Sequence, residues 1–569
     1  MDRGCAIRVL GGFRVEVEGR AVPDSAWRHR RGADLVKILA IAPDHRLHRE
    51  QIMDALWPDL APEAAAANLR KATHFARRAL GSVLAIGIEG PMVELWPSEA
   101  SVDLTEFEHA AVAAANGDDV AAKTATVLYA GELLPEDPYA DWTSAARERA
   151  RSTFLQVLRV ARMWERLVEV DPTDEEAHRE LMRSQVDAGN RQAAIRQFER
   201  LRNALREELG VSPDAATVEL YERVLEMEGD QPPTPQERVR ATLAWGLVHW
   251  NRRALDEAER SARSARSIAI DAGLGRELGE ASALLGLVAH ARGNWAEQFR
   301  IEFTDSLQRP PDLASHVFDA HLCFAEFSLY GPAGHEAIVP FARELLGLAT
   351  EAESIQGEAV AATMLGEAAL LSGDLDDAER DLSRAVELSA RAGQVSAQCL
   401  TTERLAEVAI ARGRRWEATR LLAKAKRLSQ RSALESHLLV RVLGASVLAT
   451  ADPGRALSVV VDGERALARR DVCDPCSMTF RVASATAAAR AGDFPRAERH
   501  LEDSERLAGM WQGGPWLASV WEARGVLRQA HGERGQAAAL YREAAESFSR
   551  SGRVLDARRC VRAAEQIAS

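Results

Sequence analysis

The chain has 569 residues, a hydrophobic fraction of 46%, an aromatic fraction of only 5% and a formal net charge of −13. This length is too great for one core and favours several domains or a repeat array. No apolar run of about 18 residues occurs, so no membrane-spanning helix is expected. The N-terminus lacks the apolar core of a signal peptide, and we expect a cytoplasmic protein. Six scattered cysteines do not make a disulfide framework.

Charge is distributed unevenly along the chain. Residues 1–100 carry 14 basic and 13 acidic side chains, whereas the remainder carries 58 basic and 72 acidic ones. Residues 27–49 hold six basic side chains against two acidic ones, and residues 63–80 hold four against one. The net negative charge argues against nucleic-acid binding by the chain as a whole. The concentration of positive charge in two N-terminal segments favours contact with DNA there.

The first hundred residues have the layout of a winged helix–turn–helix. The expected elements are strands within 6–24, helices over 30–42, 49–57 and 63–80, and a wing hairpin formed by 83–88 and 92–96. Proline residues at 43 and 58 separate the helices. Residues 1–100 are therefore expected to be an α+β DNA-binding domain.

The helix over 63–80 has two contrasting sides when it is wound at about 100° per residue. The apolar side consists of Ala65, Leu69, Ala72, Phe75, Ala76, Ala79 and Leu80. The opposite side consists of Ala67, Arg70, Lys71, His74, Arg77 and Arg78, with no acidic residue after Glu63. An ordinary surface helix would usually mix both signs of charge, and it stays the alternative.

A basic helix of this kind enters a major groove with its first turns at base edges and its far end at phosphates. Base-edge contacts are therefore expected from Ala67, Arg70, Lys71 and His74, and phosphate contacts from Arg77 and Arg78. Just before the first helix, further contacts to the DNA backbone are expected from Arg28, Arg30 and Arg31.

Beyond residue 102 the pattern is helical to the end, with one break at Gly229-Asp-Gln-Pro-Pro-Thr-Pro-Gln236 that is expected to be a linker. After it, turn positions recur every 38 to 41 residues, at Arg253, Gly293, Gly334, Gly373, Gly413, Gly454, Gly492 and Gly532. Five positions later stands a small residue in several repeats: Ala258, Ala378, Ala418, Ala497 and Ala537. Stacked helix pairs need a glycine at the tight turn and a small residue where two helices cross closely. The pattern predicts a mainly α chain with about eight tetratricopeptide-type repeats over 237–569.

Motifs for enzyme chemistry are missing from the sequence, which has no GxxxxGK[ST] loop, no GxSxG elbow and no HExxH pair. His45 and His48 are interpreted as residues of a solvent-facing turn rather than a metal site, because no suitable third ligand is near. Cys473 and Cys476 form a lone CxxC pair. Redox or metal use stays open for this pair, and packing in a repeat loop is favoured. No catalytic residue, cofactor or metal is expected.

Tryptophan is frequent in the repeats, at Trp245, Trp250, Trp295, Trp416, Trp511, Trp516 and Trp521. These side chains could line a concave pocket. Packing between neighbouring helices is the favoured interpretation.

Several segments, taken in order, resemble the antibiotic-regulatory type of bacterial transcriptional activators: residues 9–13, 47–57, 69–81, 102–107, 171–178, 188–202, 206–213 and 220–225. The resemblance covers about residues 5–228. It implies an OmpR-like winged helix over 1–100 and a bacterial transcriptional activator domain over 101–228. Two departures are that residues 150–172 are shorter than the usual run in the family, and that the NTPase module of larger relatives is missing.

The resemblance implies an activator that binds direct repeats near a promoter, where two protomers could lie side by side as a dimer, and that assists RNA polymerase or its sigma factor. The repeats would be a sensor or partner-binding arm for a protein, peptide or small molecule. The alternative function is a tetratricopeptide scaffold whose winged domain does not bind DNA.

Overall fold

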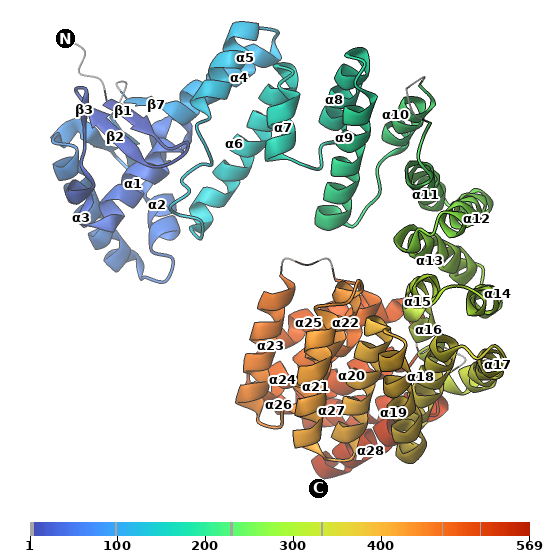
Figure 1. The fold of residues 1–569 in the computed structure, drawn as a ribbon. Helices are drawn as coiled ribbons and strands as arrows, with labels where there is room; N and C mark the ends of the chain where they lie inside the picture. Colours follow the sequence, from blue (N-terminus) through green and yellow to red (C-terminus); the bar gives the residue numbers. More distant parts are fainter. Residues whose placement is uncertain are drawn as a thin grey trace. The chain divides into compact units, whose positions relative to one another are not determined.

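The computed structural model describes residues 5–96, 100–227, 232–331, 334–468, 470, 472–511 and 514–568. They belong to two compact units, Met1–Leu201 and Arg202–Ser569, each of which is described by itself (Figure 1). Residues 229–231 of the expected linker lie outside the described part of the chain, and its last two residues already belong to a helix that begins at Pro235.

The first unit begins with a winged helix–turn–helix. Its elements are β1 (Cys5–Arg8), β2 (Arg14–Val17), β3 (Arg20–Ala21), α1 (Arg30–Ala40), β4 (Arg46–His48), α2 (Arg49–Leu56), α3 (Pro62–Ala79), β5 (Ile86–Glu89), β6 (Met92–Leu95) and β7 (Ala100–Val102). One sheet has the order β3-β2-β1-β7 and the other β4-β6-β5. β1 is antiparallel to β2 and parallel to β7. The wing strand expected from residue 83 begins at Ile86 instead, because Val83–Ala85 forms a 3₁₀ turn that the Ser82 hydroxyl caps.

Helices follow directly after β7: α4 (Asp103–Ala115), α5 (Asp119–Leu128), α6 (Asp141–Val160), α7 (Trp164–Val170), α8 (Glu175–Asp187) and α9 (Arg191–Ala204). α7, which falls in the stretch expected to be short, has only seven residues. A single apolar cluster runs from Cys5 in β1 to Ala177 in α8. The winged helix and the first helices after it therefore share one core rather than two.

The second unit is an array of antiparallel helices: α10 (Ala215–Glu226), α11 (Pro235–Asn251), α12 (Leu255–Asp271), α13 (Gly275–Ala291), α14 (Trp295–Leu307), α15 (Pro311–Ala320), α16 (Leu322–Leu329), α17 (Ile338–Glu351), α18 (Ile355–Ser372), α19 (Leu375–Arg391), α20 (Val395–Ala411), α21 (Arg415–Ser429), α22 (Glu435–Ala449), α23 (Pro453–Leu467), α24 (Met478–Ala491), α25 (Phe494–Ala508), α26 (Pro515–Ala530), α27 (Arg534–Arg550) and α28 (Val554–Ala568). None of the helices in the described ranges has an apolar stretch long enough to cross a membrane.

The predicted repeat positions are confirmed with one exception. Positive φ angles, between 59° and 87°, occur at Arg253, Gly293, Gly334, Gly373, Gly413, Gly492 and Gly532. The alanines five positions later are completely buried at Ala258, Ala378, Ala418, Ala497 and Ala537. The prediction for Gly454 is wrong, because Asp452 caps α23 and Pro453 starts it, so Gly454 lies in the first helical turn.

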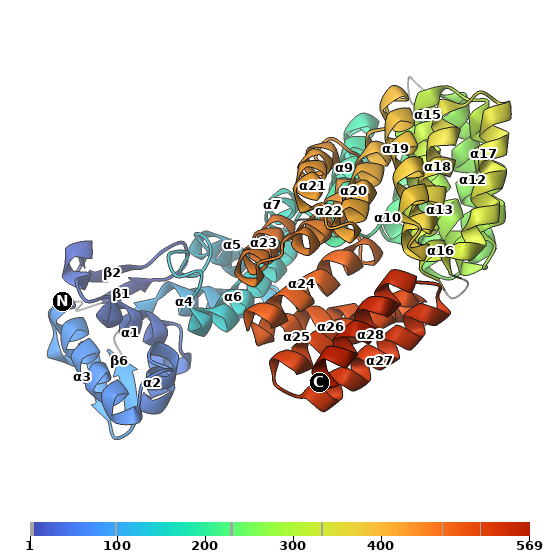
Figure 2. The same ribbon diagram turned by 90° about the horizontal axis from the view of Figure 1, so that it is seen from below.

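Helix α16 lies inside the array. Its Glu326 is ion-paired with Arg404 of α20 and Arg441 of α22. The last helices return to the neighbourhood of α16–α18 (Figure 2), where Leu555 of α28 packs against Gly373. Helix α16 thus fills part of the interior of the second unit.

Tryptophan side chains serve this interior packing. The Trp511 ring stacks on Phe327, and the Trp516 ring stacks on Tyr330, in each case with ring centroids 4.7 Å apart. Trp416 on α21 does not pack between helices. Its side chain is 77% exposed and lies beneath the guanidinium of Arg420.

Candidate nucleic-acid interface

Helix α3 rests on α1 through its apolar side. Pro62 at the first helical position and a run of alanines favour the helix, and Leu69, Ala72 and Ala76 are buried. Gly32 of α1 permits this close packing, since a Cβ there would lie 3.3 Å from the backbone nitrogen of Ala76. The His29 ring stacks on Phe75 at a centroid distance of 3.5 Å. These contacts fix which side of α3 faces solvent.

The solvent side of α3 carries the predicted basic residues. Arg70, Lys71, His74 and Arg78 are exposed, and Ala67 is half-buried. These side chains lie on the face opposite the core, as the winding of the helix predicts.

Arg77 has a second role that the sequence did not reveal. Its guanidinium is half-buried, and Nε and Nη2 both donate to the carbonyl oxygen of Ile86 in β5, at 3.0 and 2.5 Å. The residue expected only at a phosphate therefore also ties the end of α3 to the wing.

An open groove separates α3 from the wing. It is lined by Arg70, Thr73, His74, Arg77, Arg78, Gly81, Ser82, Val83 and Ile88. Val83 and Ile88 are among the most exposed apolar side chains of the unit, at 73% and 57%. Basic and apolar groups thus share one surface, which suits a nucleic-acid backbone running between helix and hairpin.

The three arginines near the start of α1 differ in their surroundings. Arg28 is exposed. The Arg30 guanidinium pairs with Asp137 at 3.2 Å. The Arg31 guanidinium pairs with Asp34 at 3.2 Å and lies 5.8 Å from the centroid of the Trp57 ring. Arg30 and Arg31 are partly neutralised within the protein, although both remain largely open to solvent.

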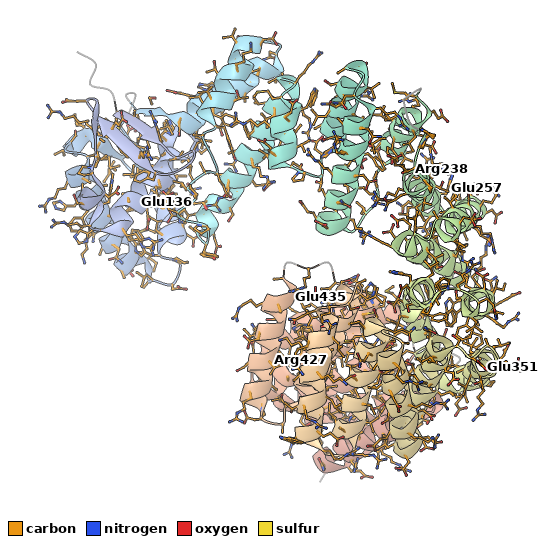
Figure 3. All side chains as sticks on the ribbon, viewed as in Figure 1. Glu136, Arg238, Glu257, Glu351, Arg427 and Glu435 are labelled. Atoms are coloured by element: carbon orange, nitrogen blue, oxygen red, sulfur yellow. The ribbon has the colours of Figure 1, made fainter. Side chains whose placement is uncertain are left out.

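Asp137 belongs to a buried ion pair that joins the winged helix to the helices behind it. The Lys37 ammonium of α1 lies 2.5 Å from the Asp137 carboxylate and 3.1 Å from Glu136, and Lys37 and Asp137 are each 6% exposed. Glu136, which is labelled in Figure 3, lies on the segment between α5 and α6. At 100° per residue Lys37 falls opposite Leu35 and Leu39, so the helical pattern of residues 30–42 did not indicate that this lysine is buried.

A second junction brings together two segments that carry the family resemblance. The Asp103 carboxylate accepts hydrogen bonds from the backbone amides of Val9 and Leu10, at 2.9 and 3.1 Å. Burial raises the pKa of Asp103, and these two amide donors act in the opposite direction. Gly11 has a φ of +81°, and a Cβ there would lie 3.2 Å from the Ala130 carbonyl carbon, so the chain around Gly11 also meets the chain around Ala130 backbone to backbone.

The two histidines considered as metal ligands have structural roles instead. His45 Nδ1 lies 3.1 Å from the Ala40 carbonyl oxygen, and its Nε2 lies 3.3 Å from the Thr105 hydroxyl. His48 caps α2, since its Nδ1 accepts from the amide of Glu50.

A comparison with curated protein sequences gave no match. Solved structures that match this chain include Mycobacterium tuberculosis EmbR in complex with a low-affinity phosphopeptide, at 19% identity over 42% of this chain and 69% of that chain, with a TM-score of 0.31. A Rap protein in complex with competence and sporulation factor has 11% identity over 58% and 99%, with a TM-score of 0.33. Yeast Tom70 has 12% identity over 82% and 95%, with a TM-score of 0.28.

A protein-family model identifies the helices that follow the winged helix. The model of the bacterial transcriptional activator domain matches residues 102–225. The match starts at the end of β7, next to the Asp103 junction, and continues through α10. Residues 102–225 of this chain therefore are a bacterial transcriptional activator domain, placed between a winged helix–turn–helix and an array of tetratricopeptide-type helices.

Proposed function

We propose that the protein is a DNA-binding transcriptional activator whose winged helix inserts α3 into a major groove. The observation that carries this proposal is the solvent side of α3, where Arg70, Lys71, His74 and Arg78 are exposed beside the wing. Arginine and lysine can grip guanine at base edges, and the cations further along the helix neutralise phosphates. Arg28, just before α1, adds a further exposed cation.

The shared core of the first unit supports a role in activation. Because Asp103 and the Lys37–Asp137 pair join the first helices of the activator domain to the winged helix, a docked α3 would also fix the orientation of the part of that domain that lies in the first unit. On this proposal two protomers bind direct repeats side by side as a dimer on the promoter, and the activator domain assists RNA polymerase or its sigma factor. The protein acts in the cytoplasm, without catalysis, and its repeats bind a protein, peptide or small-molecule effector.

The test uses a fluorescent DNA duplex from the region upstream of the protein's own gene. The full-length protein is titrated into it, and binding is measured by fluorescence anisotropy at several salt concentrations. If about four phosphates are neutralised per protomer, the logarithm of the association constant falls with the logarithm of salt with a slope of about −4. The variant Arg70→Ala/Lys71→Ala should lose affinity. Its matched control, Lys426→Ala/Arg427→Ala, removes the same two residue types from an exposed part of α21 and should bind normally.

Weak binding that ignores DNA sequence and is unaffected by Arg70→Ala/Lys71→Ala would reject the proposal. The tetratricopeptide scaffold with a winged domain that does not bind DNA would then be the better description of the protein.

A further inference from the structure

Four potential metal ligands from three separate segments meet in the second unit. Cys323 lies on α16, His437 lies on the first turn of α22, and Cys473 and Cys476 lie between α23 and α24. Their ligand atoms all lie within 4.8 Å of one another. Cys323 is separated by 114 or more residues of sequence from the other three ligands, so only the fold of the helix array brings the four together.

We propose that Cys323, His437, Cys473 and Cys476 bind one Zn²⁺ ion, which fixes the inner helix α16 to the surrounding repeats. Three cysteines and one histidine are a ligand set of structural zinc sites, and two ligands commonly come from a Cys-x-x-Cys turn. Here that turn is Cys473-Asp-Pro-Cys476, and the amide of Ser477 donates to the Cys473 carbonyl at 3.0 Å to close it.

The distances suit a tetrahedral ion. With Zn–S bonds of about 2.3 Å and Zn–N bonds of about 2.0 Å, the edges of the tetrahedron are about 3.8 Å between sulfurs and about 3.5 Å between sulfur and nitrogen. Cys323 Sγ lies 3.5 Å from Cys476 Sγ, and His437 Nδ1 lies 3.0 and 3.7 Å from the same two sulfurs. Both nearest sulfurs face the same ring nitrogen, as shared coordination requires.

The surroundings suit a closed site with a net negative charge. Three thiolates, a neutral imidazole and Zn²⁺ sum to one negative charge, and the Arg441 guanidinium lines the same small cavity as Cys323, His437 and Cys476. Arg441 pairs closely with Glu326 at 2.7 Å and more distantly with Glu367 and Glu403 at 3.9 and 4.0 Å, and its Nε and Nη2 have no hydrogen-bond acceptor among the described residues. The rest of the lining is apolar and consists of Leu322, Leu400, Leu434 and Leu438. Such a lining keeps out water that would compete for the metal.

Other uses of these groups explain less of the geometry. A disulfide needs an S–S distance of about 2.05 Å and would employ only two of the four groups, leaving His437 without a role. A two-iron cluster spreads its ligands over two iron atoms, whereas all four ligand atoms here converge within 4.8 Å. The remaining cysteines, at positions 5, 399 and 560, are buried and are not among the four converging ligands.

A bound ion would act on the interior of the array. Helix α16 has eight residues, too few to be stable alone. After Cys323, this helix carries Glu326, which is ion-paired with two arginines, and Phe327, whose ring stacks on Trp511. The metal would anchor the start of this helix to α22 and to the turn before α24.

The experiment measures metal in the full-length protein, purified without a histidine tag and under reducing conditions. Elemental analysis should find one zinc per chain. Cys323→Ser and Cys473→Ser should each lose it, whereas the matched control Cys399→Ser should retain it, since Cys399 is not one of the four converging ligands and donates to the Ala425 carbonyl instead. His437→Cys should keep the metal as a four-cysteine site.

A second measurement does not depend on the variants folding. Wild-type protein, stripped with a chelator and then titrated with CoCl₂, should develop the intense visible absorption of tetrahedral cobalt thiolate at one equivalent. Added ZnCl₂ should abolish it. In the zinc-loaded wild type, Cys323, Cys473 and Cys476 should resist alkylation, and they should react after chelation.

Three results would overturn the proposal. One is wild-type protein that contains no zinc and gives no cobalt thiolate absorption. Another is iron in place of zinc. The third is a Cys473–Cys476 disulfide in protein isolated under reducing conditions.

Discussion

The Arg77 guanidinium of α3 donates twice to the carbonyl oxygen of Ile86 in β5. Ile86 is completely buried, so this carbonyl lies at the edge of the core, and the arginine links the far end of α3 to the wing. The neighbouring Arg78 is exposed. The two adjacent arginines therefore differ in their contacts: Arg77 holds the domain together, whereas Arg78 faces solvent.

Arg77→Ala should lower stability as well as DNA affinity. Removing the donor leaves a carbonyl at the edge of the core without its partner, which costs about 1–3 kcal/mol. Affinity should fall on all duplexes alike, because the spacing of α3 and wing is no longer held. Urea unfolding and anisotropy measure the two effects. Arg78→Ala is the control, with normal stability, and equal stability of both variants would contradict the assigned role.

Arg70→Ala should change which duplexes are preferred. A bidentate arginine–guanine contact contributes about 1–3 kcal/mol of discrimination, so preference at one base position should relax by about 5- to 150-fold. Selection from a randomised duplex library, followed by sequencing, measures this. Arg70→Lys keeps the charge but not the planar fork, and it should behave like the alanine variant in preference while retaining more affinity. An unchanged preference in both variants would remove Arg70 from the base-reading set.

Asp137→Ala should destabilise the first unit. It leaves the buried Lys37 ammonium with only the partly exposed Glu136 as a partner, and breaking a buried pair in this way costs about 3–5 kcal/mol. Glu136→Ala should cost less than about 1 kcal/mol, because that carboxylate is open to solvent. Denaturant unfolding followed by tryptophan fluorescence measures both. The double variant Lys37→Met/Asp137→Asn should recover part of the loss, and no recovery would show that the pair is not the cause.

Stability should fall as the pH rises from about 5 to 8, because of Glu403. This side chain is 1% exposed, and neither carboxyl oxygen has a hydrogen-bond donor in the part of the chain that the structure describes. Burial, and then the Glu407 carboxylate, raise its pKa from 4.5 to about 8. The folded state thus binds the proton more tightly than the unfolded state, and the resulting stability is lost as the pH passes the folded pKa.

Melting temperatures of wild type and Glu403→Gln across this pH range test the effect. The amide cannot ionise, so this variant should lose that part of the pH dependence. The control Glu387→Gln, at an exposed position of α19, should follow the wild type. A Glu403→Gln variant with the full wild-type slope would assign the effect to another group.

Local patterns predicted much of this fold. Turn residues such as Gly373 and Gly413 have the left-handed backbone that the repeat needs, and Ala378 and Ala418 are buried at helix crossings. The winding of residues 63–80 gave the correct buried side of α3. These features depend on neighbours within one turn or one repeat, and periodicity records such relations directly.

Pairings across long stretches of chain could not be predicted in this way. Lys37 meets Asp137 after 100 residues, and Cys323 meets His437 after 114. No periodic signal links such positions, so Cys473 and Cys476 had the appearance of a lone pair. At Gly454 the periodic pattern was itself misleading. Its regular spacing suggested a turn, whereas Asp452 and Pro453 begin a helix there.

The strand pairing between β1 and β7, with Asp103 at its end, has a consequence for recombination. A fusion that exchanges the front of this protein at about residue 100 would separate strands that lie side by side, and would leave the Asp103 carboxylate facing a foreign sequence in place of the amides of Val9 and Leu10. The winged helix–turn–helix and the activator domain are therefore not interchangeable cassettes. Functional hybrids with relatives should cross over after the activator domain, or should carry the segments around Gly11 and Asp103 together.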